Sequence, residues 1–333
     1  MAKRKRPQKL KNAHSSSRSH RLPFDRRAME KATFEVHLAI QDRERDRLFE
    51  SHDEMNAFLR EKMDSGEPMV ASDMEKTPVE RAQTLMYKAW DARGKKRRVQ
   101  LARLALDMSP DCADAYVLLA EETTDDPVEG RALYEEGVLA GERALGAETF
   151  EEEEGAFWLY VPTRPYMRAR FGLAQSLWAL GELQEAIEHL REMLCLNPND
   201  NQGVRYLFAV CLLSEDMDEE LGELLEQYED DPAPDWLYTR ALWKFRASGV
   251  CQESKAYLAE AIEENPLVLG YLFGRWDIPE KIPATLGADP DDDAANYVVT
   301  SGHLWHKTEG AFEWLAEEIL ERGQRVRASD IGP

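Results

Sequence analysis

The chain has 333 residues, 43% of them hydrophobic, so it is long enough to bury a substantial core and is not disordered throughout. No apolar run approaches the roughly 18 residues that a membrane-spanning helix needs, and no apolar stretch follows the basic N-terminus as it would in a secretory signal peptide. We therefore expect a cytoplasmic protein, and the four widely spaced cysteines predict free thiols rather than disulfides or a metal cluster.

Charge is distributed unevenly along the chain. Residues 1–27 hold ten Lys or Arg and one acid, for a net charge of +9, whereas the remainder carries −31 and the formal total is −22. A segment so basic and so poor in large apolar side chains cannot offset the entropy lost on ordering, so residues 1–27 are predicted to form a disordered tail. Because the acidic body would repel nucleic acid, we expect a protein or peptide partner and allow nucleic acid only through the tail.

Residues 28–76 are predicted to form an N-terminal helical segment. The spacing of apolar residues becomes helical near Arg27 and stays so to about Met63. Within this segment, Ser51 is followed three residues later by Glu54, which is the capping-box pattern of a helix start.

A further helix start is predicted at Thr77, with Pro78 at the first helical position and Glu80 at the third. From here apolar residues recur at helical spacing, and no stretch shows the alternation and tight-turn residues of β-hairpins. Residues 77–146 are predicted to be degenerate tetratricopeptide units. The fold class is therefore predicted to be all-α.

Three prolines set the period of the next region. Pro198, Pro232 and Pro266 are 34 residues apart, which is the period of tetratricopeptide repeats. Three tetratricopeptide units are therefore predicted in residues 166–266, with Gly181 at the turn between the two helices of the first. Stacked helix pairs of this kind predict a right-handed superhelix, or α-solenoid.

Two segments depart from this period. Residues 147–165 are predicted to be an insert, in which an acidic run precedes a stretch, residues 157–161, that is too apolar for a free loop. This stretch is expected to dock against neighbouring helices, either filling the groove of the solenoid or widening the stack. The alternative is that it only extends the helix that follows. Residues 267–333 are predicted to be a helical cap.

Short motifs in the second half of the chain resemble known families. The stretches at residues 164–169 and 194–203 resemble uncharacterised bacterial tetratricopeptide proteins. The C-terminal third is similar to the end of the suppression-of-tumorigenicity-seven family in Asn265-Pro266, Tyr271-Leu272, Ile278-Pro279, Asp293-Ala294-Ala295-Asn296-Tyr297, Trp305 and Glu309-Gly310-Ala311. The resemblance spans roughly residues 157 to 320. It implies a tetratricopeptide fold and supplies no catalytic residues.

The concave face of a tetratricopeptide stack is lined by the first helix of each unit. Arginines and large aromatic side chains recur at the positions that face this groove, and these residue types anchor many protein interfaces. In an acidic protein, a row of arginines predicts a partner segment that bears carboxylates. The alternative is that Trp178 and Trp243 are packed between neighbouring units. The predicted groove residues are Arg168, Phe171, Gln175, Trp178, Arg205, Tyr206, Trp236, Arg240 and Trp243.

No motif in the chain indicates catalysis. Glycine-rich phosphate loops and the nucleophile elbow are missing from the sequence, and His303 with His306 lacks a third metal ligand by motif. We expect no catalytic residue, no bound metal and no cofactor. The predicted function is a scaffold or adaptor that binds a peptide or protein in the groove. The alternative is a regulatory protein that contacts nucleic acid or the ribosome through the basic tail. The sequence leaves the oligomeric state open.

Overall fold

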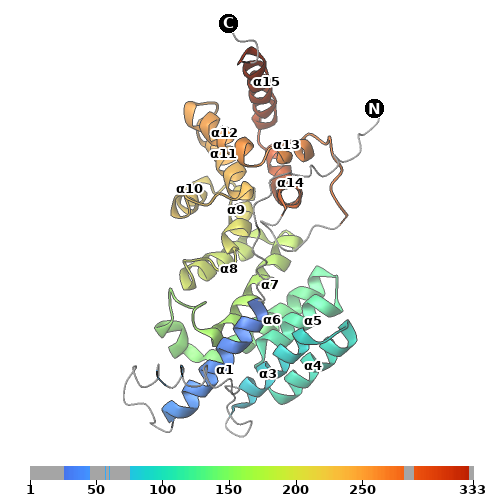
Figure 1. Ribbon diagram of the computed structural model, residues 1–333, viewed down its shortest axis with the longest axis vertical. Coiled ribbons are helices and arrows are strands. Elements are labelled where there is room, and N and C mark those ends of the chain that lie inside the picture. Colours follow the sequence, from blue (N-terminus) through green and yellow to red (C-terminus); the bar gives the residue numbers. More distant parts are fainter. Residues whose placement is uncertain (1–25, 46–56, 58–59, 61–75, 281–288, 330–333) are drawn as a thin grey trace. The chain divides into compact units, whose positions relative to one another are not determined.

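A computed structural model of the chain describes residues 26–45, 57, 60, 76–280 and 289–329 (Figure 1). All regular structure over these residues is helical, so the all-α prediction is confirmed for the described part of the chain. The predicted tail as far as Asp25 and the predicted capping box at Ser51 lie outside the described residues, whereas Arg26 and Arg27 belong to the first helix. None of the described helices combines the length and the apolar character needed to cross a bilayer.

The chain divides into two compact units, an N-terminal unit of residues 17–204 and a C-terminal unit of residues 205–333. The helices of the N-terminal unit are α1 (Arg26–Arg45), α3 (Pro78–Asp91), α4 (Lys95–Met108), α5 (Ala113–Thr123), α6 (Pro127–Glu152), the short 3₁₀ helix η1 (Val161–Thr163), α7 (Arg164–Leu180) and α8 (Leu183–Leu196). Those of the C-terminal unit are α9 (Val204–Ser214), α10 (Asp218–Gln227), α11 (Pro234–Ser248), α12 (Gln252–Glu264), α13 (Leu267–Leu272), α14 (Pro290–Lys307) and α15 (Ala311–Ser329).

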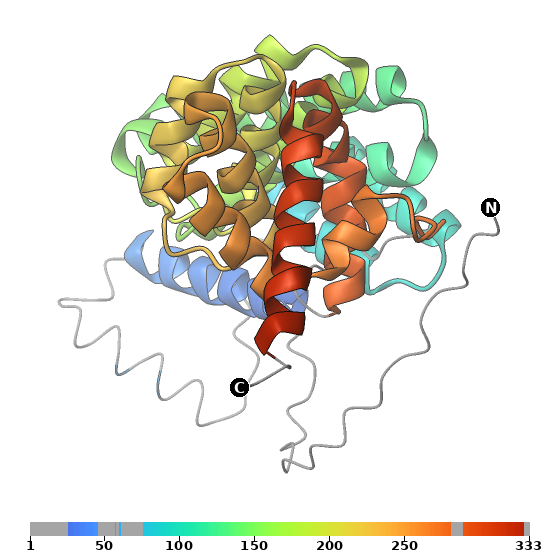
Figure 2. The same ribbon diagram turned by 90° about the horizontal axis from the view of Figure 1, so that it is seen from above.

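The described part of the N-terminal unit consists of helix pairs and the single helix α1. The pairs are α3 with α4, α5 with α6, and α7 with α8, and the second helix of each pair packs against the first helix of the next. The first helices α3, α5 and α7 also contact one another, so together they form one continuous face. Helix α1 belongs to no pair and lies against the unit as a separate helix (Figure 1 and Figure 2).

The start of α3 is fixed by the capping box that the sequence predicts. The hydroxyl of Thr77 accepts a hydrogen bond from the backbone N–H of Glu80 at 3.3 Å, and the Glu80 carboxylate accepts one from the N–H of Thr77 at 2.6 Å. Pro78 occupies the first helical position, where no N–H is required. The predicted helix start is confirmed.

The turns within the helix pairs are short, and several of them use a residue with positive φ. Gly181, with a φ of 78°, reverses the chain from α7 into α8, as the sequence predicts. Asp216, with a φ of 59°, lies between α9 and α10, and Asp is one of the few residues other than Gly that enter this region readily. Because such turns leave little chain between the two helices, each pair is antiparallel.

Small residues allow the helices of the N-terminal unit to approach closely. Ala174 of α7 and Ala186 of α8 are fully buried. Gly172 of α7 lies against Tyr134 of α6, and a Cβ atom added there would be 2.2 Å from the Tyr134 ring. Any larger residue would therefore have to move the ring or push α6 away from α7.

The segment between α6 and α7 is built into the N-terminal unit. Helix α6 is kinked at Gly146, and the chain then turns back toward α7 through η1. The ring of Phe157 is fully buried, 5.0 Å from the ring centre of Phe150 and 5.9 Å from that of Tyr166. Its N–H donates to the carbonyl of Leu196 at 3.1 Å. The segment therefore packs at the joint before α7.

In the C-terminal unit, the core is dominated by aromatic side chains. Trp236, Tyr238, Tyr297 and Trp305 are all fully buried. The indole N–H of Trp305 donates to the Tyr297 hydroxyl at 2.7 Å, and the Tyr238 hydroxyl donates to the carbonyl of Asn265 at 3.0 Å. These bonds satisfy the polar atoms of Tyr238, Tyr297 and Trp305, which α11 and α14 bury against each other.

Candidate functional site

Helix α1 lies on the face formed by the first helices of the N-terminal unit. Its contacting residues recur every three or four positions, which places them on one side of the helix. They contact α3, the α6–α7 segment and α7. The positive charge of Arg27 also interacts with the carboxylate of Glu121 on α5. These α1 residues are Arg27, Glu30, Lys31, Phe34, His37 and Leu38.

Glu30 is the polar centre of this contact. Its carboxylate is only 7% exposed and accepts hydrogen bonds from Arg168 Nη1 at 3.0 Å and from the Tyr87 hydroxyl at 3.3 Å. Arg164 adds a longer ion pair at 3.7 Å. Burial, followed by the negative charge of Glu30, raises the pKa of Tyr87 above its ordinary value, so this hydroxyl stays a hydrogen-bond donor.

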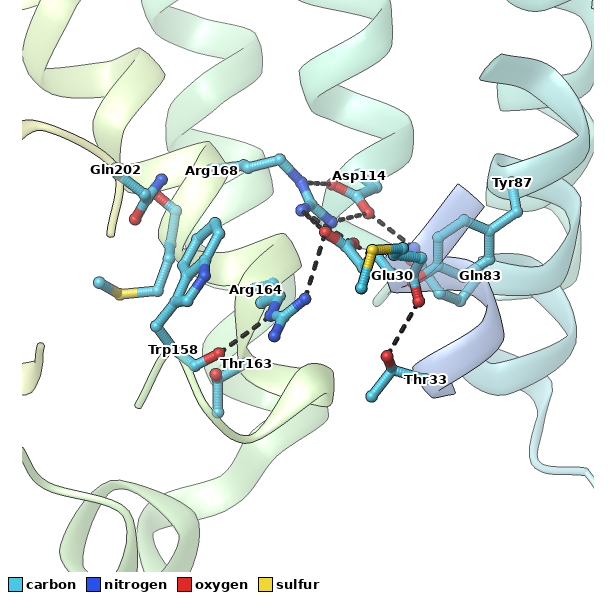
Figure 3. A network of polar contacts seen from close by, with 12 residues as sticks. Glu30, Thr33, Gln83, Tyr87, Asp114, Trp158, Thr163, Arg164, Arg168 and Gln202 are labelled. Atoms are coloured by element: carbon cyan, nitrogen blue, oxygen red, sulfur yellow. Dashed lines mark hydrogen bonds and ion pairs between the residues drawn. The ribbon is translucent and has the colours of Figure 1, made fainter. Parts of the chain in front are cut away.

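Arg168 joins Glu30 to a second buried acid. It donates to the two oxygens of Asp114 at 2.8 Å and 2.6 Å, and Asp114 is completely buried (Figure 3). The amide of Gln83 donates to the same carboxylate at 2.7 Å. Burial opposes the charge on Arg168, but attraction and hydrogen bonds from Asp114, with attraction from Glu30, raise its pKa above the ordinary value. Arg168, Glu30 and Asp114 thus form a cluster in which each charged group has an oppositely charged partner within the chain.

Aromatic rings complete the contact with α1. Trp90 of α3 lies under two guanidinium groups, with Arg27 3.8 Å and Arg168 5.3 Å from the ring centre. Phe34 and Leu38 of α1 form a small apolar cluster with Tyr87, Val161 and part of Trp90. The α6–α7 segment therefore supplies one wall of the place where α1 lies.

A cavity of about 310 Å³ lies beside α1. Its wall is mostly apolar, and the polar groups reaching it include Gln83 and the thiol of Cys112. Burial, followed by the charge of Asp114, raises the pKa of that thiol above its ordinary value, so Cys112 is a weak nucleophile. The arrangement is suited to binding and offers no activated nucleophile at this cavity. Its lining also includes Phe34, His37, Val79, Leu145, Tyr160, Val161 and Tyr166.

The predicted groove residues of α7 lie in the N-terminal unit. Arg168 is already bonded to Asp114 and Glu30, so its charge is neutralised within the chain. Phe171 and Trp178 are partly buried and Gln175 is exposed. All four follow Arg164 along one side of α7, because their spacing is three or four residues.

The other predicted groove residues lie in the C-terminal unit and meet partners there. Arg205 and the Tyr206 hydroxyl both donate to Asp231, at 2.7 Å and 2.8 Å. Trp236 is fully buried, and its ring is enclosed by those of Tyr206 and Tyr228, so it belongs to the core and is not open to a partner.

Arg240 and Trp243 are also used within the C-terminal unit. Arg240 donates to Glu260 at 2.6 Å. Trp243 lies against Gly222 of α10 and donates to the carbonyl of Asp218 at 2.8 Å. Trp243 therefore packs between helix pairs, which is the alternative that the sequence left open for this residue.

Several residues of the ion network were missed by sequence reasoning, among them Glu30, Tyr87 and Asp114. Glu30 and Tyr87 lie outside the repeat positions that face a groove, and nothing in their local sequence marks them. Asp114 carries a signal, because it is the lone acid in the otherwise apolar run of residues 113–120. An acid in such a run is buried with the helix face and needs a cation.

A second cavity, of about 500 Å³, belongs to the C-terminal unit. Four acids line it, namely Asp231, Asp235, Glu264 and Asp293. Burial, followed by the charge of Asp293, raises the pKa of Asp235 to about 7. Asp231 is already bonded to Arg205 and Tyr206.

Comparison with known proteins places the sequence beside a named family. The family model described as ST7 protein matches residues 69–316. Suppressor of tumorigenicity 7 protein-like from Rattus norvegicus is 28% identical over an alignment of 257 residues, which covers 70% of this chain and 45% of the relative. Protein ST7 homolog from Caenorhabditis elegans is 26% identical over 276 residues, covering 70% of this chain and 49% of the relative. The chain thus spans just under half the length of these curated relatives.

A solved structure is also similar in part. The crystal structure of YrrB, "a TPR protein with an unusual peptide-binding site", aligns with 57% of this chain and 85% of its own, at 18% identity and a TM-score of 0.40.

Proposed function

The chain belongs to the ST7 protein family, and we propose that it is a protein-interaction scaffold whose N-terminal unit binds a helical segment of a partner protein on the face of α3, α5 and α7. One observation carries this proposal: the same face already binds a single helix, α1, through a buried carboxylate and two apolar side chains. A face that accommodates one amphipathic helix has the shape and the polar groups to accommodate another.

The proposed surface extends beyond α1 along α7. Phe171, Gln175 and Trp178 continue the side of α7 from which Arg164 and Arg168 contact α1. A large aromatic ring beside an exposed amide offers both apolar area and hydrogen bonds. The partner segment would contact these residues in addition to the region that α1 covers.

This proposal gives the chain no catalytic role and places it in a reducing compartment such as the cytoplasm. In support, all four cysteines are free thiols. Burial raises the pKa of Cys112 and also that of Cys211, so neither buried thiol is activated. The alternative, in which the basic tail binds nucleic acid or the ribosome, is favoured only by the charge of +9 on residues 1–27.

Site-specific photo-crosslinking tests the proposal. A photoreactive phenylalanine analogue replaces the exposed Gln175 on α7 or, as a matched control, the exposed Glu188 on the second helix α8. We expect the Gln175 chain to crosslink to a defined partner that the Glu188 chain does not capture. Equal capture by both positions, or none by either, would contradict the proposed surface. Nuclease treatment and deletion of residues 1–25, which keeps Arg27 of α1 on Trp90, separate this outcome from the alternative, because capture through nucleic acid on the tail is lost under either treatment.

A further inference from the structure

We propose that α1 is a built-in competitor that occupies the partner-binding face, and that the partner is an amphipathic helix with a carboxylate followed four and eight residues later by large apolar side chains. This inference rests on the proposed function and specifies both its regulation and the chemistry of its partner. Binding of the partner then requires that α1 leave the face.

The first argument is that the repeat units close their own core without α1. An apolar cluster under α3, α4 and α5 is made of residues such as Met86, Leu101 and Leu118, and none of the α1 side chains that the structure describes, residues 27–38, belongs to it. Phe34 and Leu38 of α1 instead join a separate small cluster with Tyr87, Val161 and Trp90. Release of α1 would therefore uncover a surface and leave the core of the helix pairs closed.

The second argument is the chemistry of the face beneath α1. Without α1, Arg168 would keep Asp114 but lose its second carboxylate, and the Tyr87 hydroxyl would lose its acceptor Glu30. The Trp90 ring would lose the guanidinium of Arg27. A guanidinium, a hydroxyl donor and an indole ring side by side recognise a carboxylate on a helix whose next turns are apolar.

The third argument is the incomplete fit of α1. The cavity of about 310 Å³ is lined by Phe34 and His37 of α1 on one side and by residues of α3, α5, α6 and α7 on the other. The cavity is partly open to solvent, so α1 leaves part of this face unfilled. A helix with a larger apolar side chain at the position of His37 would fill this space, so a partner helix can bind the face better than α1 does.

A labelled synthetic peptide with the sequence of residues 26–45 tests the competition in the full-length chain. The variant Phe34→Ala/Leu38→Ala weakens the hold of α1, so we expect it to bind the peptide about tenfold more tightly than the wild-type chain does, by fluorescence anisotropy. Met29→Ala is the matched control, because Met29 lies on the same helix but is 51% exposed. It should bind like the wild type. A Glu30→Lys peptide should lose at least about tenfold in affinity, because it brings a cation to Arg168.

Amide hydrogen exchange of the wild-type chain gives a second measurement, which uses no substitution in the chain. We expect the amides of α1 to exchange at least about tenfold faster than those of α7, and faster still when excess peptide carrying His37→Trp is added. The exchange of α4 should not change. If α1 is as protected as α7 and the peptide leaves it so, or if the Glu30→Lys peptide binds equally well, the inference is wrong. If crosslinking at Gln175 persists in that case, the scaffold function stands and only the competition by α1 fails.

Discussion

At the scale of single residues, the stability of the N-terminal unit depends on whether each buried charge has a partner of opposite charge. Arg168 and Arg131 each contact more than one carboxylate, yet their surroundings differ. The acids around Arg168, Glu30 and Asp114, have side chains that are 8% and 0% exposed. Those around Arg131 are 38% to 59% exposed. Water therefore screens the charges around Arg131, whereas the charges around Arg168 are neutralised only by other protein groups.

This difference predicts unequal effects of the same substitution. Arg168→Met leaves two carboxylates buried, so we expect it to lower the free energy of unfolding by about 3 to 5 kcal/mol. Arg131→Met removes exposed pairs and should cost about 1 kcal/mol or less. Urea denaturation followed by circular dichroism measures both. Equal losses of unfolding free energy in the two variants would mean that Arg168 does not neutralise two buried carboxylates as its contacts indicate.

At the scale of elements, the α6–α7 segment is a structural joint with an exposed edge. Its Phe157 is enclosed by rings from both flanking helices, and Thr163 donates to the carbonyl of Tyr160 at 2.7 Å. Leu159, two residues further on than Phe157, is 67% exposed. The segment orders the start of α7, and it also provides Val161 and Tyr160 for contact with α1.

Two substitutions within this segment separate its core from its edge. Phe157→Ala should lower the free energy of unfolding by about 3 to 5 kcal/mol, because it opens a cavity between α6 and α7. Leu159→Ala should change it by less than about 0.5 kcal/mol. Chemical denaturation of the full-length variants compares them. A small effect of Phe157→Ala would show that the ring is not part of the core.

At the scale of the whole molecule, the ion network is confined to one unit. Every described partner of Arg168 lies in residues 17–204, including the Trp90 ring and the two acids. A unit with its own core and its own polar contacts has what a domain needs to fold alone.

We therefore expect a chain limited to residues 17–204 to unfold cooperatively. Arg168→Met should destabilise it by the same amount as in the full chain, within about 0.5 kcal/mol, because the substitution touches nothing beyond this unit. Thermal and urea denaturation of the two lengths, each with and without the substitution, make the comparison. A fragment without cooperative unfolding, or a much smaller effect of the substitution, would show that the network depends on the C-terminal unit.

The sequence alone determined the features that are local or periodic. The capping box at Thr77 and the turn at Gly181 depend on hydrogen bonds and φ angles within a few residues. The 34-residue proline period marks the ends of helices because Pro cannot continue one, and helices α8, α10 and α12 each end shortly before one of the three prolines.

Only the tertiary structure decided which charges are engaged and which rings are buried. Arg168 meets Glu30 across 138 positions of the chain, and no local pattern encodes a contact between residues so far apart. Trp236 has the residue type and position of a binding anchor, but the packing of Tyr206 and Tyr228 encloses its ring. A side chain's chemistry follows from its type, whereas its availability to a partner depends on neighbours that folding brings from elsewhere in the sequence.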